Sequence, residues 1–96
     1  EREIEFHAAL RWLRKRWDVS RLLCEGGGEL NAALIGAGLV DELFLTLCPL
    51  IIGGRTAPTL ADGNGVPTLH QAATFRLTHH RQIGDELFLR LRRAPD

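Results

Sequence analysis

The chain passes from an apolar stretch through one carboxylate and three glycines directly into a helical pattern. Residues 19–25 have the length and apolar character of a short strand, Gly26 to Gly28 follow, and the helix begins behind them. Glycines let a backbone take positive φ and approach a ligand with no Cβ between them. The helix start adds unbonded N–H groups and the positive end of the helix dipole. This strand, loop and helix therefore predict an α/β fold with an anion pocket at the glycine loop.

Glu25 stands at the carboxyl end of the predicted strand, where open α/β sheets place their ligands. Its carboxylate can accept a hydrogen bond from a second molecule, or it can bond the backbone of the glycine turn. The glycines themselves can serve a tight turn alone, so both alternatives stay open from the loop. Neither standard nucleotide motif fits, because a dinucleotide fingerprint needs glycine where Asn31 stands, and a P-loop needs a Gly-Lys-Ser/Thr ending.

Composition limits the function classes. A chain of 96 residues with 45% hydrophobic and 25% charged residues is at most one globular domain. The formal net charge is 0, so no general field attracts nucleic acid or an anionic membrane, and phosphate recognition must be local. No apolar run reaches the length of a membrane span and no signal-peptide layout opens the sequence, so we expect a cytoplasmic protein. Cys24 and Cys48 lie in apolar runs, which predicts buried, reduced thiols.

Two helices are expected in the first half of the chain. The first has helical spacing of its apolar residues, ends near Asp18 and should pack on a sheet; its stripe is Phe6, Leu10, Leu13 and Trp17. The second follows the glycine loop and ends at Gly38; its predicted buried stripe is Leu30, Ala33, Leu34 and Ala37.

The second half is expected to hold the rest of the sheet. Residues 39–52 are apolar with little alternation, which predicts a central strand covered on both faces and ended by Pro49. Residues 53–67 form a loop that is either mobile or folded over a ligand. The alternating residues 75–80 and 87–92 flank a turn at Gly84, and they predict an antiparallel hairpin.

Charged and metal-binding residue types outside the glycine loop give little indication of a further functional site. His79 and His80 are adjacent, so on a strand their rings point to opposite faces, and we predict no metal site. Arg55 is expected to be a solvated loop residue. The basic residues near the C-terminus are expected to form a solvent-facing strand face: Arg90, Arg92 and Arg93.

Residues 23–54, reading LCEGGGELNAALIGAGLVDELFLTLCPLIIGG, resemble the C-terminal reductase domain of the bifunctional riboflavin biosynthesis deaminase/reductase. The matching features are the Glu-Gly-Gly start, the GLVDEL turn at 38–43, and the strand that runs into Pro49 and the glycine pair at 53–54. The hairpin from Phe75 to Leu91 also resembles the end of that domain. The combined pattern is specific, whereas Glu-Gly-Gly alone would be weak.

The resemblance implies a dihydrofolate-reductase-like fold: an α/β three-layer sandwich whose mixed sheet ends in an antiparallel hairpin. It implies NADPH-dependent reduction of 5-amino-6-(5-phosphoribosylamino)uracil to the ribityl compound. Hydride transfer of this kind needs orientation and a dry site rather than a nucleophile, so no catalytic side chain is assigned. The implied substrate residue is Glu25, and the implied NADPH residues are Gly27, Gly28, Glu29, Leu30, Asn31, Ala32 and Ala33.

Length is the departure from the family. A complete domain is roughly twice as long, so residues 1–96 are expected to be the C-terminal portion of one reductase domain, unable alone to fold stably or to catalyse. We expect the flank of strand 43–47 to be left open, and we expect a homodimer. Two alternatives remain. One is a related reductase of another pterin or pyrimidine; the other is a non-catalytic module for nucleotide binding or dimerisation.

Overall fold

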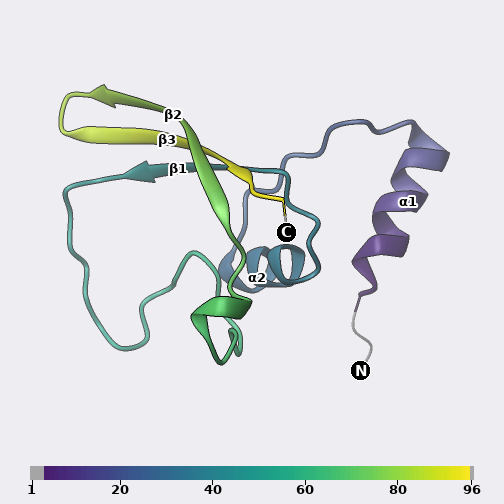
Figure 1. Ribbon diagram of the computed structural model, residues 1–96, viewed down its shortest axis with the longest axis horizontal. Helices are drawn as coiled ribbons and strands as arrows, with labels where there is room; N and C mark the ends of the chain where they lie inside the picture. Colours follow the sequence, from purple (N-terminus) through teal and green to yellow (C-terminus); the bar gives the residue numbers. More distant parts are fainter. Residues whose placement is uncertain (1–3, 96) are drawn as a thin grey trace.

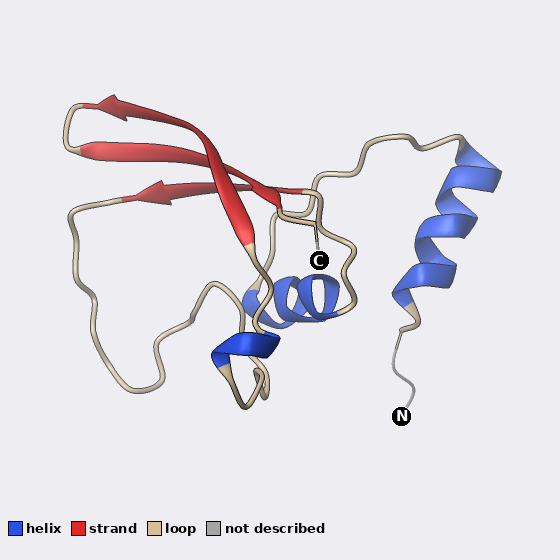
Figure 2. Cartoon of the chain, in the orientation of Figure 1, coloured by secondary structure: helices blue, strands red, loops and turns tan. Residues whose placement is uncertain are grey.

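The computed structural model describes residues 4–95 and combines helices with one antiparallel sheet. Figures 1 and 2 show the elements in order. They are α1 (Phe6–Trp17), α2 (Gly28–Gly36), β1 (Glu42–Leu47), the short 3₁₀ helix η1 (Leu69–Gln71), β2 (Phe75–Ile83) and β3 (Glu86–Arg93). The strand order is β1-β3-β2, with both pairings antiparallel. The α/β class and the closing hairpin are confirmed.

The β2–β3 hairpin turns at Gly84, whose φ of 61° lies in the left-handed region that favours glycine. A β-bulge at Thr78 interrupts its register between Leu77 and His79. The Thr78 hydroxyl donates to the carbonyl of Arg90 at 3.0 Å. Because the bulge adds one residue, His79 lies opposite Arg90 and on the other face from Leu77. The predicted unbroken alternation of residues 75–80 is therefore wrong beyond Thr78.

The sheet has one leucine-rich face and one mixed face. On the mixed face Glu42 accepts from Arg90 at 2.8 Å and lies 3.5 Å from Arg92, while the Arg90 guanidinium stands 5.4 Å from the centre of the Phe44 ring. Arg93 points to the opposite face and donates to the carbonyl of Gly38. The predicted basic face is thus wrong for Arg93, and its other two arginines are paired with an acid.

Helix α1 is confirmed in its extent but not in its packing. It ends at Asp18, which has a φ of 52°, and Glu5 caps its start by accepting from the N–H groups of His7 and Ala8. Trp12 and Trp17 are 56% and 66% exposed, and none of its residues is buried. Figure 1 shows α1 apart from the sheet. The apolar stripe meets no second layer within residues 4–95, so the predicted packing on a sheet is wrong for this chain.

The predicted strand at residues 19–25 is absent, because no neighbouring strand takes up its N–H and C=O groups. Its leucines Leu22 and Leu23 are 58% and 77% exposed. For the same reason β1 lies at the edge of the sheet rather than at its centre, with Phe44 and Leu47 exposed. The open flank of β1 agrees with the prediction. The strand also ends just before Pro49, as predicted.

Helix α2 ends in a Schellman motif. The N–H of Gly38 donates to Ile35 and the N–H of Leu39 donates to Leu34, both at 3.0 Å, with Gly38 at a φ of 73°. This confirms Gly38 as the residue that ends the helix. Leu34 is the one apolar residue of the described chain that is buried. Leu30 and Ala33 are exposed, so half of the predicted buried stripe is wrong.

Both cysteines are free thiols, as predicted, but Cys24 is only half-buried and Cys48 is exposed. The expectation that both are buried is wrong because their apolar runs face outward here. Among the helices of residues 4–95, none combines the length and apolar character needed to cross a membrane.

Candidate functional site

The glycine loop holds two glycines with different constraints. Gly26 has a φ of 93° and therefore needs glycine for its backbone, and the peptide bond that joins it to Gly27 is cis. Gly27 caps α2 with an extended backbone, at φ −78° and ψ −158°. A Cβ built on Gly27 would meet no atom within 4 Å. The packing of the chain itself therefore does not demand glycine at this position.

The first turn of α2 presents unbonded backbone donors. Gly27 supplies no capping side chain, and the first bond inside the helix runs from the N–H of Asn31 to the carbonyl of Gly27 at 2.9 Å. The N–H groups of Gly28, Glu29 and Leu30 donate no hydrogen bond to any described residue. Three such donors at the positive end of a helix dipole favour an anion, and the open space over Gly27 lets it approach.

Glu25 is exposed and makes no hydrogen bond or ion pair with the described part of the chain. The alternative in which it bonds the backbone of the glycine turn is not seen. Its carboxylate is therefore free to accept a hydrogen bond from a second molecule bound beside the loop.

Asn31 uses its side chain within the protein. Its amide Nδ2 donates to the carbonyl of Leu60 at 2.9 Å, and its Oδ1 lies 3.7 Å from the Cys24 thiol that donates to it. The predicted cofactor residues thus divide into two groups. Residues 27–30 form the N-terminal end of α2, here called the mouth of α2, where the free N–H donors lie. Asn31, Ala32 and Ala33 lie in the following part of α2, where each N–H is bonded to the carbonyl four residues earlier.

The turn Thr59–Asp62 also lies against this mouth, a contact that no sequence pattern predicts. The N–H of Asp62 donates to the carbonyl of Gly28 at 3.0 Å. A Cβ built on Gly28 would meet the Asp62 carboxylate and would lie 2.8 Å from the carbonyl of Thr59. This turn begins 31 residues beyond Gly28 in the sequence. The only expectation that bears on its contact with Gly28 is the alternative in which loop 53–67 folds over a ligand.

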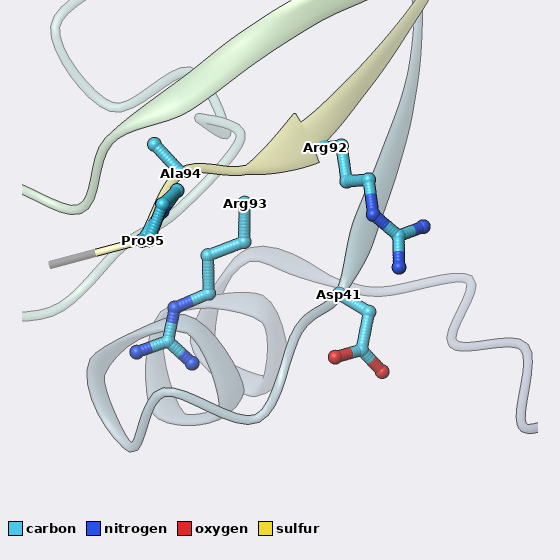
Figure 3. A pocket seen from close by; sticks show the side chains of 5 residues that line it. All are labelled: Asp41, Arg92, Arg93, Ala94 and Pro95. Carbon is cyan, nitrogen blue, oxygen red and sulfur yellow. The ribbon is translucent and has the colours of Figure 1, made fainter.

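Two surface hollows lie elsewhere. One, of about 290 Å³, lies at the end of β3 and is lined by five residues whose side chains Figure 3 shows: Asp41, Arg92, Arg93, Ala94 and Pro95. The other, of about 340 Å³, lies over the mixed sheet face between Phe44 and Phe88. The glycine loop lines neither of them. Within the described residues no three His, Cys, Asp or Glu side chains gather in a way that could hold a metal ion.

Comparison with known proteins gives a consistent assignment. The family model of the RibD C-terminal domain matches residues 2–89. A 2,5-diamino-6-ribosylamino-4(3H)-pyrimidinone 5′-phosphate reductase of Methanothermobacter thermautotrophicus is 35% identical over 88 residues, which are 92% of this chain and 40% of that protein. The like-named reductase of Archaeoglobus fulgidus is 44% identical over 63 residues, 66% of this chain and 28% of that protein.

Solved structures agree on the fold. RibD of Acinetobacter baumannii superimposes with a TM-score of 0.83 at 23% identity, over 98% of this chain and 26% of that one. A pyrimidine reductase-like protein of Corynebacterium diphtheriae superimposes with a TM-score of 0.76 at 20% identity, over 98% and 37% of the two chains. The chain spans less than half the length of these relatives. With its glycine loop, hairpin and near-complete family match, the chain belongs to the RibD C-terminal domain family.

Proposed function

We propose that the protein containing this chain is an NADPH-dependent reductase of a phosphoribosylaminopyrimidine in riboflavin biosynthesis. The single observation that carries the proposal is the mouth of α2, where three N–H groups donate no hydrogen bond to the described residues and no described atom requires position 27 to be glycine. A dinucleotide phosphate suits such a mouth because the donors are already aligned and no described atom lies within 4 Å of the space over Gly27. Residues 1–96 would be the C-terminal portion of the reductase domain.

In this proposal each residue has one task. The backbone of residues 27–30 binds cofactor phosphate, while Asn31, Ala32 and Ala33 hold that turn in place from the adjoining part of α2. The free carboxylate of Glu25, directly before the glycines, accepts a hydrogen bond from the pyrimidine and orients it. NADPH, when bound, would supply a hydride for conversion of the ribosyl unit to the ribityl chain. The chain contributes orientation rather than a nucleophile.

Two substrates are compatible with the proposal. The uracil compound 5-amino-6-(5-phosphoribosylamino)uracil is implied by the resemblance to the bifunctional enzyme. The 2,5-diaminopyrimidinone is favoured by the activity for which the Methanothermobacter and Archaeoglobus relatives are named. We further propose a cytoplasmic homodimer, in keeping with the family resemblance.

Titration of the full-length protein with NADPH tests the cofactor site. Gly27→Val should weaken NADPH binding about 100-fold, because losing two charge-assisted hydrogen bonds costs about 3 kcal/mol. Gly36→Val is the matched control: it makes the same substitution at the last residue of the helix that Gly27 caps, where a Cβ also meets nothing within 4 Å. The control should bind NADPH as the wild type does. Equal affinity of the Gly27 variant and the wild type would contradict the cofactor site.

Steady-state kinetics test the role of Glu25. Glu25→Gln should keep NADPH affinity and lower kcat/KM for the pyrimidine about tenfold or more, because the amide accepts a weaker hydrogen bond than the carboxylate. Turnover should be compared for both phosphoribosylaminopyrimidines and for dihydrofolate. Preference for dihydrofolate would favour a different reductase of this fold, and NADPH binding with no turnover would favour a non-catalytic module.

A further inference from the structure

The connection from β1 to η1 touches α2 through one short turn. Residues 48–68 contain no helix or strand, and Figure 1 shows them extending away from the sheet before they return beside α2. The hydrogen bonds between this connection and α2 come from the segment Thr59–Asp62. Connections of this length without secondary structure are commonly functional. The segment that docks is therefore the candidate functional part of the connection.

The Asp62 carboxylate shapes the turn. Its Oδ1 accepts from the N–H of Thr59 at 3.3 Å and from the Thr59 hydroxyl. The closed turn then makes two bonds to α2: the N–H of Asp62 donates to the carbonyl of Gly28, and Leu60 accepts from the amide of Asn31. Since Gly28 lies in the first turn of α2 and Asn31 directly follows that turn, the connection holds this turn from the side.

Gly28 is fitted to this contact. It has no positive φ, so its backbone does not require glycine. A Cβ there would collide with the Asp62 carboxylate and with the carbonyl of Thr59 at 2.8 Å. The glycine is thus required by the docking of the turn, whereas Gly27 beside it is open.

We propose that Thr59–Asp62 is a latch that docks the 48–68 connection on the first turn of α2, and that Asp62 is a positioning residue for cofactor binding. The proposal rests on the proposed function, because the donors that the latch steadies are those assigned to NADPH phosphate. Docking fixes the turn that carries the unbonded N–H groups of Gly28 to Leu30. NADPH binding and latch closure should therefore strengthen each other by the same factor.

Asp62 holds the turn through the position of its acceptor oxygen rather than through its negative charge. Both hydrogen bonds that its carboxylate accepts from Thr59 are to Oδ1, an oxygen that an asparagine side chain also presents. Asp62→Asn should therefore keep the latch, while Asp62→Ala should open it. Asp85→Ala is the matched control, because Asp85 lies in the exposed hairpin turn and makes no hydrogen bond or ion pair with the described residues.

Trypsin supplies a direct assay, because Arg55 is the one Lys or Arg between Arg21 and Arg76 and lies exposed in the connection. In the full-length protein without NADPH, cleavage after Arg55 should be about tenfold faster in Asp62→Ala than in the wild type, and unchanged in Asp62→Asn and Asp85→Ala. Saturating NADPH should slow cleavage in the wild type. Equal cleavage rates in the wild type and Asp62→Ala would overturn the latch.

Binding and kinetics separate positioning from general stability. Asp62→Ala should raise the Kd for NADPH about five- to tenfold, leave kcat near the wild-type value at saturating NADPH, and be rescued by Asp62→Asn. A five- to tenfold fall in kcat with no change in the Kd for NADPH would overturn the positioning role. Wild-type protein that shows the latch in the trypsin assay but binds no NADPH would refute both the coupling and the proposed function. Normal NADPH binding in Asp62→Ala would refute the coupling alone.

Discussion

Gly38→Ala tests how the end of α2 is fixed to the sheet. Gly38 holds the left-handed residue of the Schellman motif at a φ of 73°, and its carbonyl accepts from Arg93 at the end of β3. Figure 3 shows the Arg93 side chain directed toward α2. One residue therefore ends the helix and joins it to the last strand.

The cost of the substitution has a backbone part and a contact part. Alanine in the left-handed region costs about 1–2 kcal/mol. The new Cβ would also lie 2.9 Å from Arg93 Nη2 and 3.0 Å from Nη1, so the guanidinium must move and its bond to Gly38 weakens. Since Arg93 is exposed, this part adds only about 0.5–1 kcal/mol. The total is about 1.5–3 kcal/mol.

Urea unfolding of the full-length protein measures these parts through a double-mutant cycle. Arg93→Ala alone should cost about 0.5–1 kcal/mol, and Gly38→Ala in that background should cost only the backbone part. Gly38→Asn should cost less than Gly38→Ala, because asparagine tolerates the left-handed region. A Gly38→Ala variant as stable as the wild type, or an asparagine variant less stable than the alanine one, would refute the reasoning.

Three smaller predictions follow from other contacts. The hydrogen bond from the N–H of Ala8 lowers the pKa of Glu5 from its usual value of 4.5. This cap therefore stabilises the fold above pH 4.5 and loses its effect as the pH falls through the lowered pKa. The difference in free energy of unfolding between the wild type and Glu5→Gln should vanish in acid. The hydrogen bond to Glu86 raises the pKa of the Cys48 thiol, so Glu86→Gln should shift its alkylation by iodoacetamide to lower pH, as followed by peptide mass. Gly36→Ala should raise the free energy of unfolding, measured in urea, by about 0.5–1 kcal/mol, because the position is helical and a Cβ there meets no atom within 4 Å.

Elements defined by neighbours in sequence were predicted well. The extent of α1, the start and end of α2, and the hairpin around Gly84 depend on caps, glycines and residue periods that lie within one segment. The mouth of α2 belongs to the same class. Its donors come from consecutive residues, so the Glu-Gly-Gly pattern is enough to predict where free N–H groups gather.

Elements that depend on a partner were predicted less well. Residues 19–25 have the composition of a strand, but a strand forms only when another strand bonds to it. The stripe of α1 has the right period for burial, yet Trp17 remains 66% exposed because nothing described lies over it. In both cases the pattern correctly marks an apolar face but cannot supply the surface that covers it.

The site shows the same division on a smaller scale. Glu25 and residues 27–30 are placed by local sequence, whereas the latch joins Asp62 to Gly28 across a connection with no periodic pattern. A glycine run is ambiguous in sequence because one glycine can serve a turn, another a ligand and a third a neighbouring segment. In the site that we propose, the three uses fall on consecutive residues: Gly26 for its positive φ, Gly27 for open approach of the cofactor, and Gly28 for contact with Asp62. Substitution of each glycine should therefore fail in a different assay, namely folding, cofactor binding and loop protection.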